Sequence, residues 1–252
     1  MKYFISELKY KMNDILASNI HFDEKASSDL RENGLAVVEN FLSQEECAKL
    51  RTEMDIMCEK DYVWRDEHNS DIRIHGAENV NKFFKNLFDR KNLFNVYKKY
   101  IDKYSLHQFI MANRVSFSEN NKGSGGGWHR DSVNRRQLKF IMYLSDVNDK
   151  NGCFQYVVKS HTLLNKFQYN RILGKGLSEY RYSNEDIEKL KQKLDIKIID
   201  NVGKAGTLLI VDTSGLHRGK PIIEGTRYAV TNYMSDVKFP AQIQQLILTG
   251  TN

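Results

Sequence analysis

A glycine run in the middle of the chain leads directly to two side chains that can bind a metal ion. The glycines at residues 125–127 are followed by Trp128, His129 and, after one more residue, Asp131. Residues two apart on an extended strand point to the same face, so a single ion can contact both. Such a pair also arises by chance in a chain of 252 residues, so its meaning depends on a third ligand.

His217 is the candidate for that third ligand. It follows a strand-like segment, residues 206–212, and a short turn. Two histidines and one carboxylate with open coordination positions are the ligand set of non-haem Fe(II) oxygenases. Arg227 comes next, on what we expect to be the partner strand of a hairpin. A guanidinium there can bind a carboxylate through two parallel hydrogen bonds, which is how a dicarboxylate co-substrate would be anchored.

An ordinary structural role is the alternative for each of these residues. His129 and Asp131 could form a hydrogen-bonded surface pair, and His217 could be a core histidine whose ring nitrogens are satisfied. Either explanation is sufficient for one residue taken singly. The presence of all three residues, with Arg227 in a matching context, favours the metal site.

Three other histidines are expected to lie outside the metal site. His161 ends a predicted strand directly after Ser160, where turn hydrogen bonds are its expected role. His68 and His75 lie in a polar, irregular segment, residues 61–78, without a carboxylate at ligand spacing. We expect that segment to be a loop bordering the substrate pocket, because binding residues are often carried on loops.

Short strands are the elements that must position the candidate ligands. From about residue 106 the periodicity becomes strand-like, with Met111, Asn113, Val115 and Phe117 on one face. Similar segments, separated by turns that contain glycine, follow at residues 138–144, 154–158, 196–199, 207–212 and 227–234. Many short strands with glycine turns are typical of a sandwich or barrel. We therefore expect a mainly β fold with flanking α-helices.

Helices are predicted mostly before these strands. The patterns indicate helices at residues 1–18, at 43–60 behind a capping box at Ser43, and at 80–100 with a break near Arg90; a short strand at residues 35–38 follows an Asn-Gly turn. We expect one domain, residues 1–252, with a helical N-terminal part to about 104 and a barrel at about 105–240. A lid-like insertion at about 163–194 would include a charged helix capped at Ser183, although a purely structural insertion is equally compatible with the pattern.

Composition excludes several classes of protein. Hydrophobic residues make up 40% and charged residues 28%, with 2 prolines, which is the composition of a soluble globular protein. The longest apolar runs are far below the roughly 20 residues that span a bilayer, and no secretory signal opens the chain, so a cytoplasmic location is expected. The 3 cysteines match no zinc or redox motif, and we expect reduced, buried thiols.

The net charge of +6 and a pI near 9.0 favour anionic partners. Arg130, Arg135 and Arg136 stand beside the proposed metal loop, and with Trp128 they are the expected substrate contacts. They suggest a substrate with a phosphate, a carboxylate or a nucleotide-linked sugar. A nucleic-acid-binding protein is an alternative, but the chain lacks a basic run with interleaved aromatic residues, so we expect a small-molecule partner.

At these motifs the chain resembles the phytanoyl-CoA dioxygenase family of Fe(II)/2-oxoglutarate-dependent oxygenases, which includes ectoine hydroxylase. The resemblance covers about residues 30–235. It rests on the combination of several short segments, at residues 32–34, 37–38, 43–46, 122–125, 128–131, 144–146, 151–152, 160–161 and 206–233. In two respects the chain departs from the family pattern: Gly219 replaces a frequent serine, and the interval from His217 to Arg227 is one residue shorter than usual.

The resemblance implies a double-stranded β-helix, the cupin-like jelly-roll barrel. It implies that His129, Asp131 and His217 bind Fe(II) and that Arg227 binds the distal carboxylate of 2-oxoglutarate, with O2 as the other co-substrate. Lys139 and Asn113 stand at strand positions where the family often contacts 2-oxoglutarate.

Related halogenases replace the carboxylate ligand with a small residue, whereas this chain retains Asp131. Hydroxylation, desaturation or ring closure is therefore favoured over halogenation. The expected function is oxidation of a C–H bond in a metabolite, natural product or sugar derivative. A jelly-roll protein that binds a metal or small ligand without catalysis is the other alternative.

Overall fold

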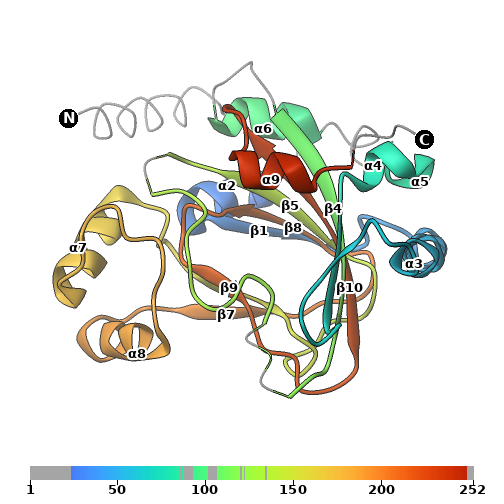
Figure 1. The fold of residues 1–252 in the computed structure, drawn as a ribbon. Helices are drawn as coiled ribbons and strands as arrows, with labels where there is room; N and C mark the ends of the chain where they lie inside the picture. Colours follow the sequence, from blue (N-terminus) through green and yellow to red (C-terminus); the bar gives the residue numbers. More distant parts are fainter. Residues whose placement is uncertain are drawn as a thin grey trace.

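Two antiparallel sheets form the framework of the protein. The computed structural model describes residues 24–85, 87, 93–101, 107–119, 121, 123–133 and 135–248. The large sheet has seven strands, in the order β1 (Leu35–Val38), β8 (Leu208–Asp212), β5 (Leu138–Tyr143), β10 (Thr226–Ser235), β4 (His107–Ser116), β3 (Asp71–His75) and β2 (Trp64–Arg65). The small sheet has the order β7 (Ile198–Asn201), β6 (Phe154–Val157) and β9 (His217–Gly219), and it lies below β1 and β8 in Figure 1.

This arrangement confirms the predicted jelly-roll fold. Strands far apart in the sequence are neighbours: β10 pairs with both β4 and β5, and β8 lies between β1 and β5. Crossing connections of this kind bring residues from distant segments onto one sheet face. Within the described residues, strand pairing does not join the two sheets into a closed barrel.

The large sheet also includes strands from the part of the chain that we expected to be mainly helical. β1, β2 and β3 all precede residue 105, so the expected boundary there divides the sheet. The segment at residues 61–78 is not simply irregular, because β3 pairs with β4 from Asp71 to His75. Its isoleucines, Ile72 and Ile74, are buried in the core, and polar residues alternate with them. This alternation is the period-2 pattern of a half-buried strand, which the polar residues on either side of it obscured.

One group of helices covers one face of the large sheet, and a second group lies in the insertion between two strands of the small sheet. The first group contributes buried residues to the core and is α2 (Glu24–Asn33), α3 (Gln44–Cys58), α4 (Ala77–Val80), α5 (Lys82–Lys85) and α6 (Leu93–Ile101); α9 (Ala241–Leu246) follows β10 and has no buried residue. The insertion forms α7 (Leu163–Leu173) and α8 (Asn184–Lys193), which lie beyond the small sheet at the lower left of Figure 1. None of the helices in the described ranges has the length and apolar character needed to cross a bilayer.

The helix predictions that rested on capping residues are confirmed by the structure. Ser43 caps α3 through a capping box with Glu46, as predicted, and Ser183 caps α8 in the same way. The aromatic segment at residues 80–100 is divided among α4, α5 and α6 in its described parts. The predicted helix at residues 1–18 and the predicted break near Arg90 lie outside the described residues.

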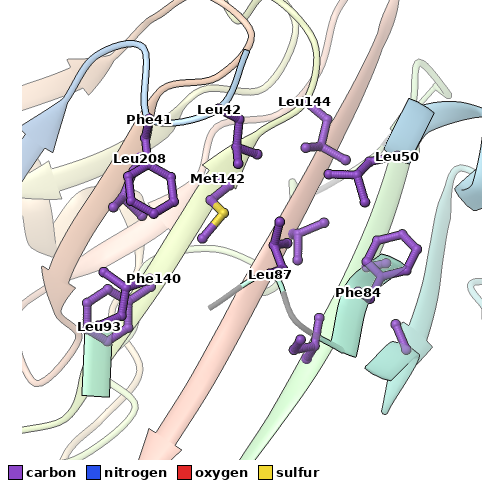
Figure 2. Packing of buried hydrophobic residues seen from close by; sticks show 14 of the residues in the cluster. Phe41, Leu42, Leu50, Phe84, Leu87, Leu93, Phe140, Met142, Leu144 and Leu208 are labelled. Carbon is purple, nitrogen blue, oxygen red and sulfur yellow. The ribbon is translucent and has the colours of Figure 1, made fainter. Parts of the chain in front are cut away.

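The main hydrophobic core fills the space between these helices and the large sheet (Figure 2). Phe140 and Met142 of β5 are fully buried there, beside Leu208 of β8 and Leu50 of α3. Successive side chains of a strand point to opposite faces. The other residues of β5, which include Lys139 and Tyr143, therefore face the space between the two sheets. The strand thus carries polar side chains on the face that is turned away from the core.

Two of the buried histidines, His75 and His161, lie outside the candidate metal site, and His161 has the structural role expected of it. His161 is 3% exposed, and its Nε2 lies 3.2 Å from the Arg31 carbonyl oxygen at the end of α2. Burial lowers the pKa of His161 to about 4, and burial also lowers the pKa of His75 to about 4. The folded protein therefore keeps both rings neutral under conditions in which the unfolded chain protonates them.

We expect the metal-free protein to lose stability as the pH falls from about 6.5 to about 4. In that range the unfolded chain binds protons at these histidines and the folded chain does not, which costs on the order of 2–3 kcal/mol for each ring. Urea denaturation across this range should show a smaller loss of unfolding free energy in His161→Asn than in wild type. His68→Gln, at a half-exposed histidine, is the control; an unchanged loss in His161→Asn would contradict the assignment.

Candidate metal centre

His129, Asp131 and His217 lie together between the two sheets. The Nε2 atom of His129 is 3.7 Å from Asp131 Oδ1, and the Nε2 atom of His217 is 3.5 Å from Asp131 Oδ2. The two imidazole centroids are 4.3 Å apart. One ligand atom from each residue falls within 4.8 Å of the others, a separation that a single ion can bridge.

Backbone pairing sets this arrangement. His129 and His217 exchange two hydrogen bonds, with N···O distances of 2.9 and 3.0 Å, so residue 129 extends the small sheet beyond β9. The Asp131 amide donates to the Thr213 carbonyl at 2.9 Å. Both candidate segments are thus fixed directly to each other, although they are distant in sequence.

The expected hairpin between His217 and Arg227 is wrong. His217 belongs to β9 of the small sheet, whereas Arg227 belongs to β10 of the large sheet. The connecting residues bond elsewhere: the amide of Lys220 donates to the Cys153 carbonyl, and that of Ile223 donates to the Lys150 carbonyl. The connection therefore crosses from one sheet to the other, and the two side chains meet across the gap.

Hydrogen bonds fix the orientation of both imidazoles. Nδ1 of His129 lies 2.8 Å from the Gly127 carbonyl oxygen, and Nδ1 of His217 lies 2.9 Å from that of Gly215. A carbonyl only accepts, so each Nδ1 carries the proton and each Nε2 is left with its lone pair directed toward Asp131. Outer partners of this kind commonly orient histidine ligands in metal sites.

The charge states also suit a cation. Burial lowers the pKa of both His129 and His217, so their rings are neutral at pH 7. Burial would raise the pKa of Asp131, but the adjacent Lys139 ammonium outweighs it and holds that pKa well below its usual range. Two neutral imidazoles and a carboxylate are the protonation states that a metal ion requires.

Lys139 lies directly beside this carboxylate. Its Nζ is 2.6 Å from Asp131 Oδ2 and 4.2 Å from the centroid of the Tyr233 ring. Lys139 belongs to β5, on the face opposite Phe140, which explains how a lysine can be buried here. Lys139 therefore forms an ion pair with the candidate ligand Asp131, and it also lines the cavity described next.

A cavity of about 90 Å³ adjoins the triad, and we call it the inner cavity. Its lining includes both candidate histidines and three cationic side chains. The polar residues that line it are Arg73, Asn113, Ser124, His129, Lys139, Tyr143, His217, Arg227, Thr231 and Tyr233. Such a lining suits a small anion with several hydrogen-bond acceptors.

Arg227 differs from the other two cations of the inner cavity. Lys139 pairs with Asp131 and Arg73 pairs with Asp71, whereas no carboxylate forms an ion pair with Arg227 within the described parts of the chain. Arg227 is 6% exposed and donates to two neutral acceptors, the Gly152 carbonyl and the Asn113 side-chain oxygen. A buried cation without a counter-ion is costly, so the geometry favours an anion beside it.

Asn113 holds this guanidinium in place. Its Oδ1 accepts from Arg227 at 3.2 Å, and its Nδ2 donates to Asp71 Oδ1 at 2.6 Å. Asn113, Arg227 and Lys139 all line the inner cavity, so the three residues that the sequence associated with the co-substrate lie around one space. The side chain of Asn113 is engaged on both sides by protein partners.

Three of the residues expected to contact the substrate, Trp128, Arg130 and Arg136, are buried and bind other parts of the protein. Arg130 is 2% exposed and donates to the carbonyls of Ser160 and Ser214, both at 2.7 Å. Trp128 is buried in a separate apolar cluster, with the Arg218 guanidinium over its ring. Arg136 is buried with its guanidinium over the ring of Tyr100. None of these three lines the inner cavity.

Arg135 is partly exposed and pairs with Asp236 at 3.3 Å, also away from the inner cavity. The expected preference for an anionic substrate rested on these arginines. Their placement removes that support, because Arg130 binds backbone carbonyl groups, Arg136 packs on Tyr100 and Arg135 is paired with Asp236.

Sequence patterns missed several residues that line the inner cavity. Arg73 was overlooked because its strand resembled a loop, although the alternation around Ile72 and Ile74 could have revealed it. Tyr143 and Tyr233 lie on predicted strands, but nothing in their local pattern distinguishes them from core residues.

The insertion is attached to the candidate ligand His129. The amide of Arg130 donates to the Tyr180 carbonyl, and the amide of Tyr182 donates to the Trp128 carbonyl. Residue 129 is therefore paired on one side with His217 and on the other with Arg181. The Arg181 side chain also donates to the Gly125 carbonyl at 2.6 Å, which fixes the glycine run against the metal centre.

A side chain at Gly125 would collide with the ring of His129. This steric effect can be measured separately from backbone strain, because Gly127 has the strain without the collision. A Cβ at Gly125 would lie 2.6 Å from His129 Cε1, whereas a Cβ at Gly127 would have no atom within 4 Å. Both glycines have positive φ, so each alanine costs about 1 kcal/mol of strain. We expect Gly125→Ala to weaken Fe(II) binding at least about tenfold, measured by metal titration, and Gly127→Ala to bind as wild type. Equal affinities in the two variants would contradict the proposed contact.

Comparisons with known proteins agree with this geometry. A sequence model of the phytanoyl-CoA dioxygenase (PhyH) family matches residues 30–223. A search among curated protein sequences found no match.

Similar solved structures include the epimerase SnoN in complex with Fe3+, alpha ketoglutarate and nogalamycin RO (TM-score 0.67, 16% identity, covering 91% of each chain). HygX from Streptomyces hygroscopicus with nickel, 2-oxoglutarate and hygromycin B is also similar (TM-score 0.60, 14% identity, covering 86% of this chain and 89% of that one). EctD from S. alaskensis with bound Fe is a third (TM-score 0.64, 16% identity, covering 86% and 78%). At these identities the structures show a shared fold.

Proposed function

The chain belongs to the phytanoyl-CoA dioxygenase (PhyH) family, and we propose that it hydroxylates a C–H bond of a small molecule. Members of this family are Fe(II)- and 2-oxoglutarate-dependent oxygenases, so the chain is an enzyme of that class, with iron and 2-oxoglutarate as its cofactors. We assign the iron to His129, Asp131 and His217, and the distal carboxylate of 2-oxoglutarate to Arg227.

The residues present fit these groups. Two imidazole Nε2 atoms converge on one carboxylate with their Nδ1 atoms already bonded. In the same cavity, Arg227 Nε is buried without a hydrogen-bond partner among the described residues. A metal ion and a carboxylate are the two groups that would satisfy this set of donors. The observation that carries the proposal is that one cavity contains the two histidines of the triad together with Arg227, for which the described residues supply no carboxylate partner.

Bound iron and 2-oxoglutarate would supply the oxidation: O2 places one oxygen in the product alcohol and the other in succinate, with release of CO2. The protein's own residues perform the binding and orientation. Arg227, held by Asn113, would fix one end of the dicarboxylate. Lys139 would keep the Asp131 carboxylate ionised and oriented, and we propose it as a further contact of the co-substrate.

The small-molecule substrate is supported by the similar structures. Nogalamycin RO is bound in the SnoN structure, and hygromycin B is bound in the HygX structure. The retained carboxylate, Asp131, favours hydroxylation over halogenation, because a halogenase of this kind would leave its position open for chloride.

Anaerobic addition of Fe(II) and 2-oxoglutarate tests this proposal. We expect a visible charge-transfer band in wild type that is lost in His129→Ala, followed by succinate formation when O2 is admitted. Absence of the band in a folded wild-type protein would refute the proposal. A band without any succinate would favour a jelly-roll protein that binds its ligands without catalysis.

A further inference from the structure

A second cavity, which we call the outer cavity, lies beside the inner one and has a volume of about 250 Å³. One wall is the β2–β3 connection, which contributes Asp66, Glu67, His68 and Ser70. The opposite wall includes residues of the glycine run. Its larger volume makes it the roomier of the two spaces next to the candidate metal centre.

The two cavities share walls. Arg73 lines both of them. On β4, Asn113 lines the inner cavity and Val115, two residues on and therefore on the same face, lines the outer one. The segment that contains the start of the glycine run is divided in the same way, because residues 124 and 125 line the inner cavity and residues 123 and 126 line the outer one. The outer cavity is thus the continuation of the inner one along the large sheet.

We propose that the outer cavity binds the primary substrate and that this substrate carries an amine on a hydroxyl-rich framework. This inference rests on the proposed function, which assigns the inner cavity to iron and 2-oxoglutarate. The inner cavity has a volume of about 90 Å³ and the outer one about 250 Å³, so the outer cavity offers more space for a second organic molecule. The adjoining space, which shares Arg73 and the 123–126 segment with the inner cavity, is where we place the part of the substrate that is oxidised.

The charges of the outer cavity disfavour an anion. Arg73 is the sole arginine or lysine among the described residues that line it, and its guanidinium is already bound by the Asp71 carboxylate, with Nε 3.1 Å from both oxygens. Two further carboxylates, Asp66 and Glu67, line the same cavity. Since Asp71 neutralises Arg73, the lining keeps a net negative charge. A phosphate or carboxylate would be repelled, and an ammonium group would be attracted.

The two acidic residues differ in what they can offer. Asp66 accepts from the Ser70 amide at 2.6 Å and the Asp71 amide at 3.0 Å, so it is fixed by the turn. Glu67 has a side chain that is 86% exposed, with His68 Nε2 3.3 Å from its carboxylate. Glu67 is therefore able to approach a ligand, whereas Asp66 adds its charge from a fixed position.

Trp64 supplies the apolar part of the lining. Its side chain is partly exposed, and the Arg73 guanidinium lies 4.9 Å from the ring centroid. An aromatic ring beside hydroxyl- and amine-binding groups suits the apolar face of a saturated ring. The combination of one aromatic platform, polar main-chain turns and net negative charge matches an amine-bearing polyhydroxylated molecule.

Three sugars with the same kind of ring but different charges test the proposal: glucosamine is cationic, glucose is neutral and glucuronate is anionic. Each is titrated anaerobically into the complete protein with Fe(II) and 2-oxoglutarate, and the change in the charge-transfer band gives its dissociation constant. We expect glucosamine to bind at least about fivefold more tightly than glucuronate. Glu67→Lys should weaken glucosamine binding about fivefold, since it changes the local charge by two units at a distance of about 8 Å in water.

Glu188→Lys is the matched control, because Glu188 is an exposed residue of α8 that lines neither cavity. Trp64→Leu provides a second variant and should weaken all three probes. A missing band in wild type refutes the proposed function itself. A band that responds equally to the three probes, responds to none of them, or gives the same glucosamine affinity in Glu67→Lys as in wild type would overturn the assignment of the outer cavity.

Discussion

Replacing His217 with alanine is expected to abolish 2-oxoglutarate turnover and to lower Fe(II) affinity by more than about a hundredfold. Loss of an outer hydrogen-bonding partner of a metal ligand typically costs about 10–100-fold in affinity, so loss of the ligand itself should cost more. His217 is 2% exposed and its ring stacks on Phe154 at 5.4 Å. The measurement is iron content after dialysis, together with succinate production.

Folding must be checked separately, because the substitution also removes a buried ring. Urea denaturation of the metal-free proteins provides that check. His68→Ala, at a half-exposed histidine, should retain the iron content of wild type. A folded His217→Ala protein that still binds one equivalent of Fe(II) with wild-type affinity would exclude His217 as a ligand.

The second large effect is expected at Arg227. Arg227→Met should raise the KM for 2-oxoglutarate by at least about thirtyfold, since truncating one partner of a buried, hydrogen-bonded charge pair costs about 2–5 kcal/mol. Fe(II) binding in the absence of 2-oxoglutarate should be unchanged. Arg227→Lys keeps the positive charge but loses the two-pronged geometry, so it should recover only part of the affinity.

Arg114→Met is the matched control for this experiment. Arg114 lies on the neighbouring strand β4, but its guanidinium pairs with Asp55 of α3 at 2.8 Å, on the opposite face of the sheet. It should change stability without changing the KM for 2-oxoglutarate. If Arg227→Met lowers stability and leaves that KM as in wild type, Arg227 has a structural role alone.

Much of the candidate site could be predicted because its signals are local. The spacing of His129 and Asp131 and the strand period around Asn113 are properties of a few consecutive residues. The capping boxes at Ser43 and Ser183 are local in the same sense. Such patterns follow from backbone geometry that does not depend on the rest of the chain.

The errors concern contacts between distant segments. Arg130 resembled a substrate residue because it stands between two candidate ligands, but its guanidinium binds carbonyls contributed by two other segments of the chain. The hairpin expectation failed for a similar reason, since the residues after His217 bond to the 150–153 segment instead of returning along β9. Which sheet a strand joins depends on its tertiary partners, and local periodicity carries no information about them.

The two-sided pairing of His129 has a consequence for how this protein could diversify. On one side His129 is fixed to β9, and on the other it is fixed to residues 180–182, which end the loop that follows α7. Helix α7 and that loop are thus joined to the metal centre through a short, backbone-mediated attachment that depends little on side-chain identity. Exposed residues of this segment, such as Leu164 and Leu177, could therefore vary while the position of His129 is preserved, whereas Tyr169 is buried in the same apolar cluster as Trp128 and is constrained with it.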